Sequence, residues 1–134
     1  MGIIFSAFVI ALVALGGWFW TTHRAEPVAG AATSVRSTLH LETFVLNLAD
    51  PGQRSYLRVG IDLGLGREIG KNENAPVAEV RDTILSVLSE ARVDDLLTAK
   101  GKAKLKQDLL QALQQRVPEL AVEDVYFTEF LIQR

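Results

Sequence analysis

Residues 55–65 read SYLRVGIDLGL, and this stretch decides the fold class. Its apolar side chains alternate strictly with polar residues or glycine, which is the period of a half-buried β-strand. Residues 39–48 (LHLETFVLNL) also favour a strand, and the turn residues Asp50, Pro51 and Gly52 separate the two. We therefore predict an antiparallel hairpin, with a bulge or two-sided burial near residues 43–46. The side chains of the second strand expected to face the interior are Leu57, Val59, Ile61, Leu63 and Leu65.

Two helices are predicted to follow the hairpin. Pro76 suits a first helical turn, and apolar residues recur at helical spacing from there to about Ser89. After a short helical turn at residues 93–97, Thr98 is placed to cap a second helix that ends before Pro118. The residues expected to face inward from these helices include Ile84, Leu88, Leu109 and Leu113.

Residues 122–133 (VEDVYFTEFLIQ) are predicted to form the last strand. Its second half is apolar on both faces, which is typical of a strand in the centre of a sheet. We expect Phe127 and Phe130 to join the same core as the hairpin and the helices. The order β-β-α-α-β predicts an α+β fold, in which the helices pack on one face of a small antiparallel sheet.

The amino-terminal residues have a different character. Residues 2–20 (GIIFSAFVIALVALGGWFW) are uncharged, and a helix of that length spans roughly 28 Å, close to the thickness of a bilayer core. Trp18 and Trp20 end the run, where aromatic rings favour the headgroup layer. We therefore expect a transmembrane anchor at residues 1–22. A signal peptide cleaved near Ala29 and Ala31 is the alternative, but its apolar core would be shorter and would follow basic residues.

Residues 23–37 are expected to be a flexible linker, because small and polar residues dominate and no apolar period is present. Residues 38–134 then form the folded domain. Charge does not decide the topology of the chain. Arg24 follows the apolar run and weakly favours a cytoplasmic domain, but one arginine leaves the orientation open.

The composition argues against several functional classes. The chain has no cysteine, which excludes a disulfide framework, a thiolate nucleophile and cysteine-ligated zinc. A net charge of −2 gives no electrostatic footprint for nucleic acid. His23 and His40 lie in different segments, and neither has the partner that a helical metal site needs. We expect no catalytic residue, no cofactor, no metal site and no small-molecule substrate.

Basic side chains are the candidate contact residues. On a helix, Lys100 and Lys104 form one row and Lys102 and Lys106 a second row, both expected to be exposed. A solvated helix face is the simpler interpretation, and contact with headgroups or an acidic partner is the alternative. The candidate partner-contact residues, on this helix and on the solvent side of the hairpin, are Arg54, Arg58, Lys100, Lys102 and Lys106.

Four segments in a fixed order resemble a known family. They are LETFVLNLAD at residues 41–50, SYLRVGIDLGL at 55–65, VRDTILSVLSEARVDDLLTAKGKAKLKQDLL at 80–110 and VEDVYFTEFLIQ at 122–133. Together they resemble the flagellar basal body-associated protein family FliL, and the similarity covers residues 38–134. An apolar anchor followed by a linker also fits that family.

The resemblance implies a single-pass protein of the bacterial inner membrane, with a stomatin-like carboxy-terminal domain in the periplasm. It also implies assembly into a homo-oligomeric ring, association with the flagellar stator, support of flagellar rotation, chemotaxis and swarming, and no enzymatic activity. The sequence departs from the family pattern in three ways: it has no basic amino-terminal tail, its linker is short, and no proline follows Thr98. A paralogue outside the motor, acting as a periplasmic ligand-sensing or cell-wall-sensing module, is therefore the alternative.

Overall fold

The computed structural model describes residues 34–52 and 54–134. The predicted anchor at residues 1–22 and most of the predicted linker lie outside these ranges. Among the helices of the described ranges, none combines the length and the apolar character needed to span a membrane.

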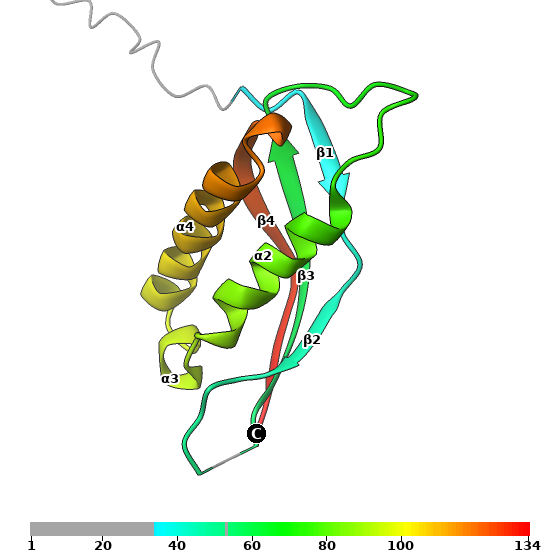
Figure 1. The fold of residues 1–134 in the computed structure, drawn as a ribbon. Helices are drawn as coiled ribbons and strands as arrows, with labels where there is room; N and C mark the ends of the chain where they lie inside the picture. Colours follow the sequence, from blue (N-terminus) through cyan, green and yellow to red (C-terminus); the bar gives the residue numbers. More distant parts are fainter. Residues whose placement is uncertain (1–33, 53) are drawn as a thin grey trace, which may run out of the picture. The chain divides into compact units, whose positions relative to one another are not determined.

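The sheet is built around β3 (Tyr56–Leu65), as the alternation of this stretch predicts (Figure 1). β1 (Ser37–His40) and β2 (Phe44–Asn47) pair antiparallel with one side of β3, and β4 (Val122–Gln133) pairs antiparallel with its other side. The predicted hairpin between β2 and β3 is confirmed. Its turn includes Gly52 at φ +91°, a conformation that glycine adopts without steric cost.

The single strand predicted at residues 39–48 is wrong, because the segment forms two strands. β1 pairs His40 with Asp62 and β2 pairs Phe44 with Val59, so one extra residue lies between the two ladders. Leu41 and Phe44 are both buried, at 2% and 1% exposure. Residues three apart point to opposite faces of a regular strand, and the break between β1 and β2 lets both side chains enter the core.

β4 has the predicted bounds, but its predicted position at the centre of the sheet is wrong. Within the described part of the chain it pairs with β3 alone and is therefore an edge strand. A register shift between Gly60 and Ile61 leaves Thr128 as an extra residue in β4. This bulge places Phe127 and Phe130 together, with ring centroids 5.5 Å apart. Both rings pack against the core but are half-buried, less than the sequence predicts.

The helices are α2 (Val77–Ser89), α3 (Val93–Leu96) and α4 (Ala99–Arg116), followed by the short 3₁₀-helix η1 (Pro118–Leu120). The predicted cap of α4 is confirmed, since the Thr98 hydroxyl accepts a hydrogen bond from the Gly101 backbone N–H at 2.9 Å. α2 and α4 pack against each other and lie on the same face of the sheet (Figure 1).

One hydrophobic core lies between the sheet and the helices, which confirms a mixed fold with an antiparallel sheet. The inward face of β3 supplies much of it, and the helices supply the rest. The predicted core residues that the structure buries completely are Leu57, Val59, Ile61, Leu63, Leu65, Ile84, Leu88, Leu109 and Leu113. On the other face of the sheet, Tyr56 and Arg58 are exposed near the hairpin end.

Candidate interaction surfaces

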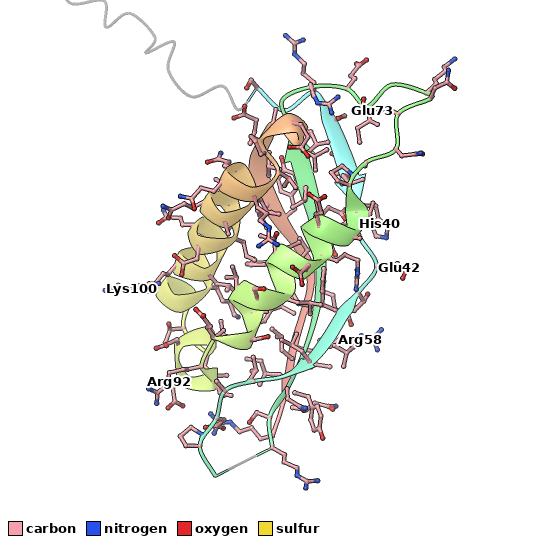
Figure 2. The ribbon with its side chains drawn as sticks, in the orientation of Figure 1. His40, Glu42, Arg58, Glu73, Arg92 and Lys100 are labelled. Carbon is pink, nitrogen blue, oxygen red and sulfur yellow. The ribbon has the colours of Figure 1, made fainter. Side chains whose placement is uncertain are left out.

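The predicted contact residues do not form one basic patch. Figure 2 shows Lys100 beside the start of α4 and Arg58 beside β2, on opposite sides of the view. Lys102 and Lys106 lie further along α4, and Arg54 lies just before β3 at the hairpin end. The structure therefore separates the helix residues from the hairpin residues.

Lys102 and Lys106 both contact β4. The Lys102 Nζ atom lies 5.0 Å from the centroid of the Phe130 ring, a cation–π distance. The Lys106 Nζ atom lies 3.7 Å from Asp124 Oδ1 and 5.9 Å from the Tyr126 ring. Lys106 is half-buried and so less exposed than predicted, because these groups of β4 cover part of its side chain. Since β4 is an edge strand, Lys106 beside its first half hinders pairing there with another chain.

Lys100 and Lys104 line a cleft between the end of α2, α3 and the start of α4. The cleft has a volume of about 690 Å³ and includes apolar side chains such as Leu96 and Leu105. The Lys104 ammonium donates a hydrogen bond to Asp108 Oδ2 at 2.7 Å, and this bond raises the pKa of Lys104. Acidic and basic groups balance in the lining, which contains Glu90, Arg92, Asp95, Lys100, Lys104 and Asp108. The cleft therefore selects neither an anion nor a cation by net charge.

The exposed face of the sheet has an apolar hollow around Arg58. The hollow has a volume of about 360 Å³ and is lined by Val45, Tyr56, Arg58, Leu131 and Gln133. Val45 is 64% exposed and Leu131 is 47% exposed, which is high for clustered apolar side chains. Arg58 itself is paired, with its Nε atom 3.0 Å from Glu129 Oε1. The sequence contained one indication of this exposed apolar surface, because β4 carries apolar residues on both of its faces.

Arg54 lies at the end of the hairpin. It is exposed and lines a shallow hollow of about 290 Å³ together with Asn47 and Tyr56. The neighbouring Ser55 is 1% exposed, and its hydroxyl donates a hydrogen bond to Asp50 Oδ2 at 3.0 Å. The hairpin end is therefore ordered by a buried hydroxyl while the arginine beside it remains accessible.

An ion pair that sequence spacing did not reveal ties together the other end of the sheet. The Arg67 guanidinium binds both carboxylate oxygens of Glu73 and donates to the Glu119 carbonyl, while the Ser37 hydroxyl donates to the Arg67 carbonyl at 2.6 Å. Hydrogen bonds from Arg67, and then from the Gly70 backbone N–H, lower the pKa of Glu73 from 4.5 to about 2. Figure 2 shows Glu73 in the loop that follows β3.

The acidic side chains and the histidine of the described domain are not grouped as a metal centre. Across residues 34–52 and 54–134, no three His, Asp or Glu side chains are grouped so that they could hold a metal ion. The His40 Nδ1 atom lies 2.7 Å from Asp62 Oδ1, but this is an exposed cross-strand pair. The fold and its surfaces define a small α+β domain whose exposed features are suited to contacts with other macromolecules.

Comparison with known proteins gives the family. Residues 38–133 match the family described as Flagellar basal body-associated protein FliL, so the chain belongs to the FliL family. It is 36% identical over 95 residues to the Flagellar protein FliL of Aquifex aeolicus (strain VF5), covering 67% of this chain and 56% of that protein. It is 27% identical over 124 residues to the Flagellar protein FliL of Bacillus subtilis (strain 168), covering 92% of this chain and 84% of that protein.

The family assignment confirms the resemblance seen in the four sequence segments. The matched region spans just over half the length of the Aquifex aeolicus relative. The match to the Bacillus subtilis relative covers more of this chain than the folded domain alone.

Proposed function

We propose that the protein is a non-enzymatic inner-membrane component of the bacterial flagellar motor. It contacts the stator and supports flagellar rotation and swarming. The observation that carries the proposal is the family match, which runs from residue 38 to residue 133 and so covers nearly all of the described domain. Two relatives, from Aquifex aeolicus and Bacillus subtilis, are both named Flagellar protein FliL.

The proposed arrangement has residues 1–22 as the anchor, residues 23–37 as the linker and residues 38–134 in the periplasm. The chain enters the sheet at Ser37, which pairs with Leu65 at the end of β3. The hairpin turn and Gln133 lie at the other end, since Gln133 pairs with Tyr56. A strand of 10 residues is about 33 Å long. The hairpin end therefore lies at the opposite end of the sheet from the point where the chain enters it.

Tethering explains how a domain of this kind acts through weak contacts. A flexible linker with as many residues as 23–37 has a root-mean-square span of about 20–25 Å. Such a linker would keep the domain close to the membrane surface. The effective concentration of partners in the same membrane is then high, and modest surfaces are sufficient for association. We assign contact with the stator to Arg54 and Arg58 at the hairpin and to Lys100, Lys102 and Lys106 on α4.

A clean deletion in the native organism tests the proposal. We expect smaller swarms in motility agar and fewer stator subunits at each motor, and the full chain supplied in trans should restore both.

Reversing the charge at Lys102 and Lys106 to Glu should reduce swarming at unchanged protein level. Lys71→Glu, at an exposed lysine in the loop after β3, is the matched control and should leave swarming intact. Unchanged motility and stator numbers in the deletion strain would refute the motor assignment.

A ligand-sensing or cell-wall-sensing role outside the motor is the second candidate, and the cleft beside Lys100 favours it. Its volume of about 690 Å³ lies in the range of small-molecule sites. Such sites usually carry only a few polar groups, however, and this cleft is lined by six charged side chains, of which Lys104 and Asp108 form an ion pair. Normal motility in the deletion strain, combined with a growth defect under cell-wall stress that Arg92→Ala reproduces, would favour this candidate over the motor role.

A further inference from the structure

We propose that copies of the domain assemble by continuing the β-sheet from one copy to the next. The carboxy-terminal half of β4 in one copy pairs with β2 of its neighbour. The inference rests on the proposed function, because it gives the motor protein a contact between its own copies and names the residues that form it.

The first argument comes from the two faces of β4. Phe130 and Ile132 pack against the core on the helix side, while Leu131 is 47% exposed on the other side. A strand that is apolar on both faces is typical of a sheet centre, yet β4 lies at an edge in the described domain. A further strand beyond β4 would give it the central position for which its sequence is suited.

The second argument comes from register. Val45, Arg58 and Leu131 lie at one level of the sheet, because Arg58 pairs with both of the others. Asn47 and Gln133 lie at the next level of the same face, on either side of Tyr56. The two edges of the sheet therefore carry matching side chains at matching heights, apolar at one level and amide at the other.

Strand direction makes the two edges compatible. β2 and β4 both run antiparallel to β3, so they run parallel to each other. A neighbour rotated about an axis roughly along the strands brings its β2 beside β4 as a parallel pair. Val45 of the neighbouring copy then contacts Leu131, and Asn47 of the neighbouring copy lies within reach of Gln133. The contact joins two different patches, and repetition of such a contact generates a ring when the rotation closes.

The rest of each edge is unsuited to pairing, which limits the contact. Lys106 lies against Asp124 and Tyr126 near the start of β4. On the other side, the break between β1 and β2 interrupts the ladder. The pairing is therefore confined to Phe130–Gln133 against Phe44–Asn47. A short parallel contact is weak, so it forms when copies are concentrated in one membrane.

Cysteine cross-linking in the full chain tests the interface, since the natural chain has no cysteine. We combine Val45→Cys with Leu131→Cys. Within one copy β3 lies between these residues, which separates their Cα atoms by about 9.5 Å, two strand spacings. That distance exceeds the roughly 7 Å limit for a disulfide, so any bond formed joins two copies. Both sites are exposed, so the substitutions spare the core.

Oxidation of cells that express the double variant should give a ladder of dimers, trimers and larger species on a non-reducing gel. Leu131→Cys alone should remain monomeric, and so should the matched pair Thr38→Cys with Leu131→Cys, whose sites lie at different heights. As a second readout, Leu131→Glu alone should abolish the ladder seen by a general amine cross-linker, and adding Val45→Lys should restore it.

Three results would overturn the interface. The first is a Val45→Cys, Leu131→Cys double variant that stays monomeric. The second is a strong dimer from Leu131→Cys alone, which would mean that β4 pairs with the β4 of another copy. The third is a ladder from Thr38→Cys with Leu131→Cys that is as strong as the ladder from Val45→Cys with Leu131→Cys. Fluorescence localisation in the same cells separates this result from the proposed function. Protein that gathers at flagellar bases without the ladder refutes the interface alone, and a ladder without localisation supports the interface and refutes the motor role.

Discussion

Gly101, in the first turn of α4, packs directly against the backbone carbonyl of Asp95 in α3, and a Cβ atom at Gly101 would overlap that carbonyl. The same carbonyl accepts hydrogen bonds from the Thr98 backbone N–H at 3.2 Å and from the Thr98 hydroxyl at 2.9 Å. The corner between α3 and α4 is therefore closed around a position that has no room for a side chain.

Gly101→Ala should destabilise the domain, although alanine is usually better than glycine inside a helix by about 1 kcal/mol. The overlap with Asp95 forces the corner apart and outweighs that gain. We expect a melting temperature several degrees lower for a fragment of residues 34–134. Gly70→Ala is the matched control, because the nearest atom to its Cβ would be 3.7 Å away. A Gly101→Ala variant that melts at or above the wild-type temperature would contradict this packing.

The core should tolerate truncation poorly and the exposed sheet face should tolerate it well. Ile61 and Leu109 are completely buried, so replacing either with Ala should lower the free energy of unfolding by roughly 2–4 kcal/mol. Leu131→Ala, on the exposed face, should change it by less than about 0.5 kcal/mol. Urea denaturation curves measure all three variants. Curves for Ile61→Ala and Leu109→Ala that match the wild type would refute the core.

The pKa of Glu73 should be measurable as a marker of the Arg67 ion pair. The carboxyl has its pKa lowered from 4.5 to about 2 in the folded domain. A lowered pKa means that the pair contributes stability above pH 4.5, and that this contribution is lost as the pH falls from there to about 2. The pair is partly exposed, so solvent screening keeps its contribution small.

NMR titration of the Glu73 side-chain carbonyl should show this low midpoint. Arg67→Met should move it back toward 4.5, because the largest cause of the shift is removed. A wild-type midpoint at the ordinary value would mean that the pair does not form in solution.

The proposed periplasmic location can be tested by labelling. Single cysteines at Arg54 and Lys100, both exposed, should react with a membrane-impermeant maleimide once the outer membrane is permeabilised. Ser55→Cys should react slowly in any state, because this position is 1% exposed, and it controls for access. Protection of Arg54→Cys and Lys100→Cys until the inner membrane is lysed would place the domain in the cytoplasm.

Local sequence signals predicted most of the elements of the domain. Strict alternation defined β3, Pro76 and Pro118 delimited the helical region, and Thr98 marked the start of α4. Each of these signals depends either on the spacing of apolar residues or on the chemistry of a single residue. Both kinds of signal can be read from the sequence alone. The break between β1 and β2 was misplaced because it depends on which side chains the completed core admits.

Features that depend on two distant elements were not predictable in the same way. The Arg67–Glu73 pair lies in an irregular loop, where no period relates its members. The basic residues of α4 were found by their density, but the contacts of Lys102 and Lys106 with β4 required the fold. The two-sided pattern of β4 was interpreted as a central strand, because sequence does not tell whether a neighbouring strand comes from the same chain.

In-cell photo-cross-linking of the full chain at Arg54 and Lys100 tests the motor assignment most directly. With a photoreactive amino acid at either position, irradiation of motile cells should capture a stator subunit, identified by mass spectrometry and absent from cells kept in the dark. Abundant protein that never captures a stator subunit from either the hairpin or the helix position would contradict the account.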